Sequence, residues 1–180
     1  VDLLERCPSR LARWIGGRSH VVAVSPNLAD RFERRSGVNV PSICPLGAGS
    51  ARLADELPSF ADAWTRQSRP KVLTVARPVR GKGYELACQV RGGAEGFDYL
   101  VVGDPAVTPA EVRALLSYAD LCVIPSLEGP DLPSEGRPHI IAQALVAGVP
   151  CLGGPNLAVR EAMREFGQRE CIAQGAHGLK

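Results

Sequence analysis

Two charged side chains flank a turn whose composition suits an anionic ligand. The segment ARPVRGKG follows an apolar, strand-like run and carries Arg77 and Lys82. Arginine presents a planar fork of donors and lysine a compact point charge, and together they suit a diphosphate. Gly81 and Gly83 would let the backbone approach such a ligand. It is not a Walker loop, because that motif has Ser or Thr after the lysine where this chain has glycine. A solvated basic turn is the simpler interpretation of this segment taken alone.

The second such segment, EGRPHIIAQALVAG, begins at Glu135. Pro138 suits the first turn of a helix, so the amides of Gly136 and Arg137 should point out of the helix N-terminus. That end attracts anions through its unpaired N–H groups and the helix dipole. Gln143 lies about 7 Å further along the axis, where it could meet a ribose attached to a diphosphate at the helix tip. A carboxylate just before a helix can equally serve only to complement the dipole.

The elements that must position these segments alternate along the chain. Short apolar runs rich in β-branched residues are each followed by an amphipathic, helix-like stretch. The predicted strands are residues 20–25, 71–76, 97–103, 120–126 and 149–154. Thr108 and Asn156 are suitable N-caps for two of the helices. This alternation favours an α/β fold with a parallel sheet covered by helices on both faces.

In such sheets ligands bind beyond the carboxyl ends of the strands. Those ends lead into the loops at 77–83, 103–105 and 126–137, so the most unusual segments should share one edge of the sheet. We expect residues 71–180 to form this domain and residues 51–70 to be a polar linker, with one short helix around residues 60–64. Residues 1–50 are expected to be the remnant of another domain, because one strand and two helices cannot enclose a core.

Composition narrows the class of protein. Hydrophobic residues make up 45% and charged residues 22% of the 180 residues, which is ordinary for a soluble globular chain. A net charge of +2 is too small to indicate nucleic-acid binding. The six cysteines are dispersed without a C-x-x-C pair, which predicts free thiols, no zinc site and a reducing compartment. No apolar stretch is long enough to span a membrane. We therefore expect a cytoplasmic protein.

Taken together, the segments resemble the C-terminal domain of retaining GT-B glycosyltransferases that carry an E-x7-E motif. VLTVARPVRGKG is similar to the family's G-R-x-x-x-x-K-G loop, and YADLCVIPS to its A-D-x-x-x-x-P-S strand. E-G-x-P, a helix and A-G-V-P then follow in the family's order, while VVAVSPNLADRF and CPLGAGS resemble the end of its N-terminal domain and its interdomain segment. The resemblance runs from about residue 21 to 150 and implies a Rossmann-like donor-binding domain.

The resemblance also implies roles for single residues. Arg77 and Lys82 would bind the donor diphosphate and stabilise charge on the leaving nucleotide, with no metal and no cofactor required. Glu135 corresponds to the first motif glutamate, which lies beside the donor sugar, and Gln143 to the second, which binds the ribose. The further donor-binding residues would be Gly83, Gly103, Asp104, Gly136, Arg137, Pro138 and His139. The acceptor, whether a glycan, a lipid or a small molecule, is not indicated.

This chain departs from the family's pattern in three ways. Gln143 replaces a glutamate, and a neutral amide should bind ribose more weakly. The VVGDP run leads almost directly into TPAEVRALL, where the family inserts another helix and strand. The N-terminal acceptor domain is nearly absent, and since the family's site lies between two domains, we expect this chain alone to bind a donor without turning it over.

Alternatives remain open at this stage. The chain could be a GT-B relative such as a sugar-nucleotide epimerase, a non-catalytic GT-B-like module that binds a nucleotide or a partner, or a generic flavodoxin-like domain. A basic amphipathic stretch at residues 3–18 is expected to pack on another domain. Its alternative role is a peripheral contact with the inner face of the membrane.

Overall fold

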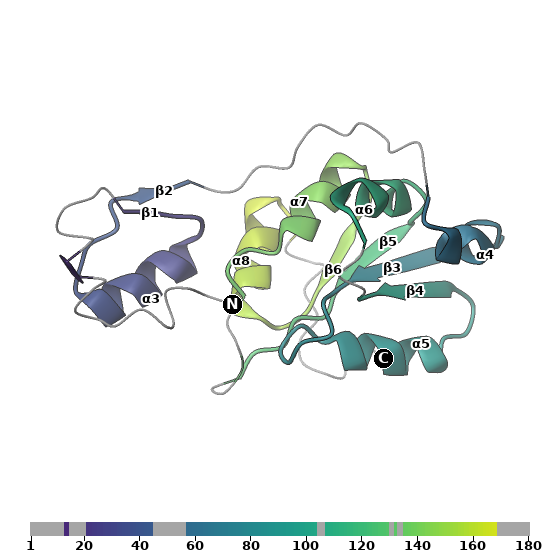
Figure 1. Cartoon of the computed structure of the whole chain (residues 1–180), viewed down its shortest axis with the longest axis horizontal. Helices are drawn as coiled ribbons and strands as arrows, with labels where there is room; N and C mark the ends of the chain where they lie inside the picture. Colours follow the sequence, from purple (N-terminus) through teal and green to yellow (C-terminus); the bar gives the residue numbers. More distant parts are fainter. Residues whose placement is uncertain are drawn as a thin grey trace. The chain divides into compact units, whose positions relative to one another are not determined.

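The chain forms two compact units, Val1–Gly47 and Ala48–Lys180. The computed structural model describes residues 13–14, 21–44, 57–103, 107–129, 132 and 135–168 (Figure 1). The division falls three residues before the expected boundary at residue 50. Among the described residues, no helix is both long and apolar enough to cross a membrane.

The first unit contains a β-α-β arrangement. Strand β1 (Val22–Ala23) and strand β2 (Ser42–Ile43) pair in parallel, and helix α3 (Pro26–Ser36) connects them. The Ser25 side chain caps α3 by accepting a hydrogen bond from the Leu28 amide at 3.3 Å. The sequence predicts β1 and α3, but it gives no strand at β2, because two residues are too few to show a strand period.

The second unit is built on a four-stranded, all-parallel sheet with the strand order β4-β3-β5-β6. The strands are β3 (Lys71–Val75), β4 (Asp98–Val102), β5 (Leu121–Ile124) and β6 (Cys151–Gly153). Each lies within a predicted strand, and the parallel sheet inferred from the sequence is confirmed. The carboxyl ends of these strands share one edge of the sheet.

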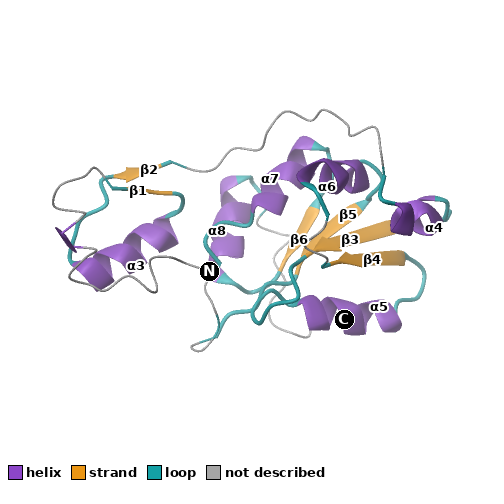
Figure 2. Ribbon diagram, in the orientation of Figure 1, coloured by secondary structure: helices purple, strands orange, loops and turns teal. Residues whose placement is uncertain are grey.

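Helices flank both faces of this sheet. Helix α5 (Tyr84–Gly92) lies on one face, and helices α6 (Pro109–Leu116), α7 (His139–Val146) and α8 (Leu157–Glu165) lie on the other (Figures 1 and 2). The alternation of strands and helices and the single strand direction make this a Rossmann-like α/β fold. All four helices were expected from the sequence.

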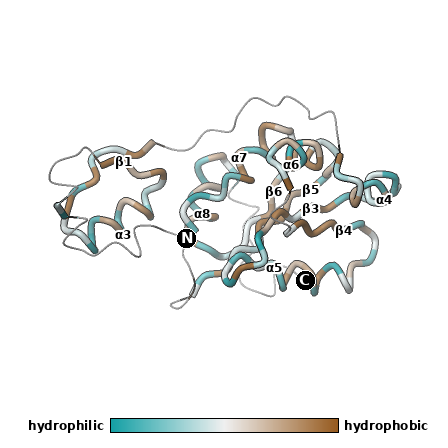
Figure 3. Tube along the Cα trace, in the orientation of Figure 1, coloured by the Kyte–Doolittle hydropathy of each residue, from teal (hydrophilic) through white to brown (hydrophobic). Residues whose placement is uncertain are grey.

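The core lies between the sheet and the three helices α6, α7 and α8. Side chains alternate across the sheet, so every second strand residue faces these helices. The strand side chains of this core are Leu73, Val102, Cys122, Ile124 and Cys151, and the helices contribute Leu115, Leu116, Ile141, Ala144, Val159, Ala162 and Met163. Figure 3 shows hydrophobic stretches along these strands, whereas the helices carry a mixture of hydrophobic and hydrophilic residues.

Caps fix where the helices begin. Thr108 and Glu111 form a reciprocal capping box at α6, and Asn156 caps α8 by accepting from the Ala158 amide, both as predicted for the cap residues. The prediction for α7 was wrong in detail. Pro138 is the N-cap, with ψ of 102°, and the helix begins at His139. A residue at ψ near 100° is extended, so Pro138 ends the preceding loop and is not part of the first turn.

The expected linker at 51–70 is also corrected over its described part. The 3-10 helix η1 (Ser59–Ala61) and helix α4 (Asp62–Thr65) form the short helix predicted around residues 60–64. Trp64 is buried in the core, and its indole N–H donates to the Asp98 carbonyl oxygen at 3.0 Å. A buried tryptophan with a satisfied N–H anchors its segment, so these residues belong to the second unit.

The unequal cover of the two faces leads to a stability prediction. Leu73→Ala truncates a fully buried side chain on the three-helix face, and we expect it to lower the free energy of unfolding by about 2–5 kcal/mol. Leu152→Ala truncates a half-buried leucine on the α5 face and should cost about 1 kcal/mol. Urea unfolding followed by circular dichroism measures both. Equal losses would contradict the assignment of the core to one face.

Candidate functional site

The loop after β3, residues 76–83, is a compact turn that we call the K-G loop. The Val79 amide donates to the Arg77 carbonyl oxygen at 2.7 Å, and the Lys82 amide donates to the Val79 carbonyl oxygen at 3.1 Å. Gly83 then caps α5 with φ of 69°. The turn therefore returns the chain to the end of the sheet, with Arg77 and Lys82 on either side of it.

Gly83 has a packing role that differs from the one expected. A Cβ atom there would lie 2.1 Å from the Pro125 carbonyl oxygen, and the positive φ disfavours any side chain. The glycine thus lets the K-G loop pack closely against the segment after β5. The sequence had predicted that it would let the backbone approach a ligand. Beside it, the Leu127 amide donates to the Gly81 carbonyl oxygen at 2.9 Å, which joins the two segments directly.

Lys82 and Glu135 form an ion pair across this edge of the sheet. The two residues are 53 positions apart, yet Lys82 Nζ and Glu135 Oε2 lie 2.5 Å apart. The Ser126 hydroxyl donates to the same carboxylate oxygen at 3.2 Å. The Lys82 side chain is 25% exposed and that of Glu135 12%, so the pair is largely shielded but open on one side. Partial burial makes such a pair stronger than one on the surface.

The pair forms part of a cavity of about 210 Å³ at the carboxyl edge, which we call the Lys82 cavity. It gathers six of the residues predicted from the sequence, including Arg77 and Lys82 of the K-G loop. Those six are Arg77, Lys82, Glu135, Arg137, Pro138 and His139. The strand ends complete the wall with Val75, Ala76, Ile124, Pro125 and Ser126, and α7 adds Ile140.

The N-terminal end of α7 borders this cavity. Pro138, His139 and Ile140 all line it, and the exposed His139 is the first residue of the helix. An eight-residue helix whose first turn faces a cavity presents its positive dipole end to whatever binds there. Arg77 also lines the cavity; it is exposed, and its guanidinium makes no ion pair with another described residue.

Arg137 lines the cavity, and its guanidinium is paired with the end of α8. Its side chain is only 6% exposed, Nη1 donates to Glu165 Oε2 at 2.7 Å, and the guanidinium lies 5.7 Å from the centre of the Phe166 ring. Both partners lie at the end of α8. The guanidinium therefore contacts the end of α8, and the role expected for the Arg137 amide in binding a ligand stays a prediction.

The remaining predicted site residues do not line the Lys82 cavity. Gln143 lies one turn further along α7, and Gly136 lies in the loop before that helix. Gly103 has a packing role, because a Cβ there would lie 2.3 Å from Tyr84 Cε2, so the glycine makes room for the tyrosine ring. Asp104 lies outside the described residues.

Sequence reasoning missed several residues that shape the cavity. Ser126 was part of a recognised P-S run, but nothing in the sequence linked its hydroxyl to Glu135. Asn156 was predicted as a cap, yet its Nδ2 also donates to the Leu127 carbonyl oxygen at 2.9 Å. Glu165 gave no signal as the partner of Arg137. All three contacts join elements that are adjacent only in the folded chain.

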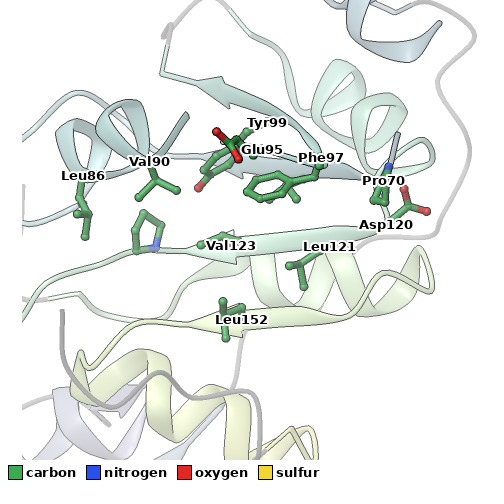
Figure 4. Close-up of a pocket in the computed structure, with 14 residues that line it drawn as sticks. Pro70, Leu86, Val90, Glu95, Phe97, Tyr99, Asp120, Leu121, Val123 and Leu152 are labelled. Carbon is green, nitrogen blue, oxygen red and sulfur yellow. The ribbon is translucent and has the colours of Figure 1, made fainter. Parts of the chain in front are cut away.

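A larger cavity of about 480 Å³ lies beside α5 on the other face of the sheet, and we call it the apolar groove (Figure 4). Its walls include Leu86 and Val90 of α5 and the sheet residues Val123 and Leu152. Its described lining contains two acidic residues at the rim and no arginine, lysine or histidine. An anionic ligand would find no positively charged side chain among these described lining residues.

The Tyr99 side chain lies at the base of the apolar groove. Its hydroxyl is 2.8 Å from Thr74 Oγ1, and Thr74 in turn donates to the Val123 carbonyl oxygen at 2.8 Å. Since the threonine hydrogen is used in that bond, the tyrosine must be the donor to Thr74. Burial raises the pKa of Tyr99, which keeps its hydroxyl protonated. This network is a structural feature that links three strands.

No protein-family profile matches the chain, and no curated protein sequence matches it. Within the described part of the chain, no group of three or more His, Cys, Asp and Glu side chains is arranged to hold a metal ion.

The close approach of Gly83 to Pro125 yields a matched pair of substitutions. Gly83→Ala forces a side chain into the positive-φ region against a carbonyl oxygen, and we expect a loss of at least about 1–3 kcal/mol in the free energy of unfolding. Gly92→Ala, at the end of α5 with nothing within 4 Å, should be neutral or should stabilise by roughly 0.5–1 kcal/mol. Thermal unfolding compares them, and an unaffected Gly83→Ala variant would refute the packing role.

Proposed function

We propose that this chain is the nucleotide-sugar-binding domain of a retaining GT-B glycosyltransferase, and that the Lys82 cavity holds the donor diphosphate. The observation that carries the proposal is the convergence of Arg77, Lys82 and the α7 N-terminus on one cavity at the carboxyl edge of the sheet. That edge is where Rossmann-like folds bind their ligands. A cavity with two cations and a helix dipole is suited to an anion with more than one charge.

The chemistry expected there is stabilisation of a leaving group. When the bond between the anomeric carbon and the diphosphate oxygen breaks, negative charge builds up on the phosphate oxygens. Arg77 and Lys82 are placed to receive those oxygens, and the amides at the start of α7 can add hydrogen bonds. Fixed positive groups that face a developing charge make a large contribution to such transfers. This residue set supplies the charge from side chains and backbone.

Glu135 would meet the sugar, and Gln143 the ribose. The Glu135 carboxylate lies at the cavity wall, held by Lys82 and Ser126. Gln143 is four residues after His139, so both lie on the same side of α7. A nucleotide whose diphosphate contacts the helix tip would therefore extend its ribose along the helix toward Gln143. The transferred sugar would lie on the opposite side, near Glu135.

The acceptor and the location follow only from the resemblance. We expect transfer to a glycan, a lipid or a small molecule in the cytoplasm, with the inner face of the membrane as the alternative place of work. The apolar groove adds no support to this assignment, because its described lining residues include no positively charged side chain for a phosphate.

A second candidate is a non-catalytic GT-B-like module that binds a nucleotide without transferring a sugar. It is favoured by the glutamine at the second motif position and by the commitment of the Arg137 guanidinium to α8. The same Lys82 cavity would serve both functions. Nucleotide binding is therefore common to them, and the Glu135 carboxylate is needed only by the transferase.

The first test is calorimetric titration of the chain with UDP, GDP and ADP, with and without magnesium. We expect one of the three to bind without magnesium. The Arg77→Ala, Lys82→Ala double variant should lower that affinity by at least about tenfold, because it removes two charge-assisted contacts.

The matched control is the Arg66→Ala, Lys71→Ala double variant. It removes the same net charge, but Lys71 lies at the amino edge of the sheet and Arg66 precedes it. We expect this control to bind like the wild type. Equal losses in the two double variants would mean that the effect is one of net charge, and would contradict a site in the Lys82 cavity.

A second prediction concerns the resting ion pair. A bound diphosphate must share Lys82 with Glu135, so Glu135→Gln should increase the affinity for inorganic pyrophosphate, which carries no sugar. We expect an increase of roughly two- to fivefold, as for the loss of one partly exposed charge contact. The same titration measures it. Weaker binding by this variant would show that Glu135 orients Lys82 and does not compete for it.

A further inference from the structure

The segment after β5 is fixed by hydrogen bonds at both polar groups of Leu127. Its amide donates to the Gly81 carbonyl oxygen at 2.9 Å, and its carbonyl oxygen accepts from Asn156 Nδ2 at 2.9 Å. Gly81 directly precedes Lys82. Leu127 directly follows Ser126, whose hydroxyl contacts Glu135. The segment 126–127 thus connects Asn156, the N-cap of α8, with both residues of the ion pair between Lys82 and Glu135.

Asn156 uses both ends of its carboxamide. Its Oδ1 accepts from the Ala158 amide at 3.0 Å to cap α8, and its Nδ2 reaches Leu127, while the residue itself is 7% exposed. Serine and aspartate cap helices equally well, but aspartate has no donor and the serine hydroxyl is short. Capping of α8 therefore does not by itself require asparagine at position 156. The hydrogen bond to the Leu127 carbonyl oxygen does require it, because that bond needs an amide donor.

The chain comes close enough for this contact because of Gly154. A Cβ atom at Gly154 would lie 2.9 Å from the Ser126 carbonyl oxygen, and the Gly154 amide donates to the Ile124 carbonyl oxygen at 2.8 Å. The turn between β6 and α8 is thereby held against the end of β5. This arrangement brings the Asn156 side chain within reach of the next peptide.

The far end of α8 holds the other side of the same loop. Glu165 binds the guanidinium of Arg137, two residues after Glu135. Arg160, in the middle of α8, lies 3.4 Å from Glu128, an exposed pair that adds little. Helix α8 thus contacts the loop that carries Ser126 and Glu135 at both of its ends, without itself lining the Lys82 cavity.

We propose that Asn156 is a positioning residue of the donor site, acting through Leu127 on Gly81 and so on Lys82. The inference rests on the proposed function for its consequence in binding, although the linkage itself is a property of the fold. Losing the Asn156 donor leaves the Leu127 carbonyl oxygen unpaired and loosens its segment. The K-G loop then loses its fixed partner, and Lys82 is held less firmly in the cavity.

The first experiment measures the linkage without a ligand. Asn156→Ser and Asn156→Asp keep a capping oxygen for α8 and remove the amide donor. In both variants we expect the Leu127 amide to exchange its hydrogen at least about tenfold faster by NMR. Thr108→Ala, which removes the cap of α6 away from the cavity, should leave that amide unchanged. An unchanged Leu127 exchange rate in folded Asn156→Ser would overturn the proposal.

The second experiment measures binding of inorganic pyrophosphate by calorimetry to the full chain. We expect Asn156→Ser to weaken it roughly three- to tenfold, and Thr108→Ala to leave it unchanged. Asn156→Asp adds a negative charge near the site, so the neutral serine variant decides the comparison. In a Lys82→Ala background, Asn156→Ser should cause no further loss, because its effect passes through Lys82.

The two experiments separate the inference from the proposed function. Faster Leu127 exchange with no pyrophosphate or nucleotide binding by the wild type would support the linkage and reject the donor site. Binding by the wild type that Asn156→Ser leaves intact would reject the role of Asn156 and keep the donor site. Additive losses of pyrophosphate affinity in the Lys82→Ala background would also contradict the role of Asn156. They would show that Asn156 affects binding by a route that does not involve Lys82.

Discussion

The close backbone contact between the K-G loop and the segment after β5 is the constraint on which the site depends. Gly83 lies so near the Pro125 carbonyl oxygen that no side chain fits, and Gly81 accepts a hydrogen bond from Leu127. Because these contacts involve backbone atoms, they set the loop position more firmly than side-chain packing would. The ion pair of Lys82 with Glu135, and with it the cavity, follows from that position.

The two faces of the sheet in the second unit differ in how they are covered. The face under α6, α7 and α8 carries the core and supplies most of the burial, and the helices that cover it also supply the site. Helix α7 presents its N-terminus to the Lys82 cavity, and α8 holds the loop that carries Glu135. Stability and ligand geometry are therefore coupled, since the same helices serve both. The α5 face carries the apolar groove, whose described lining residues include no positively charged side chain.

The positively charged side chains that line the Lys82 cavity differ in whether they are paired with a carboxylate. Glu135 pairs with Lys82, and Glu165 pairs with Arg137 at the end of α8. Arg77 and the α7 dipole remain directed at the cavity. A partly shielded lysine without a counter-ion would be costly, so Glu135 stabilises the position of Lys82. In the proposed function, a diphosphate would replace or share this contact with cations that the fold already holds in place.

The sequence by itself determined the parallel α/β fold, the caps at Thr108 and Asn156, and the group of Arg77, Lys82, Glu135 and His139 at one edge. Those features follow from local periodicity and from the rule that parallel strands end at the same edge. Only the tertiary structure decided that Trp64 belongs to the core, that Gly83 and Gly103 serve packing, and that Arg137 binds Glu165. It alone showed that the Asn156 cap also holds Leu127. Contacts between residues distant in the chain depend on how helices and loops pack in three dimensions, and that information is absent from residue spacing.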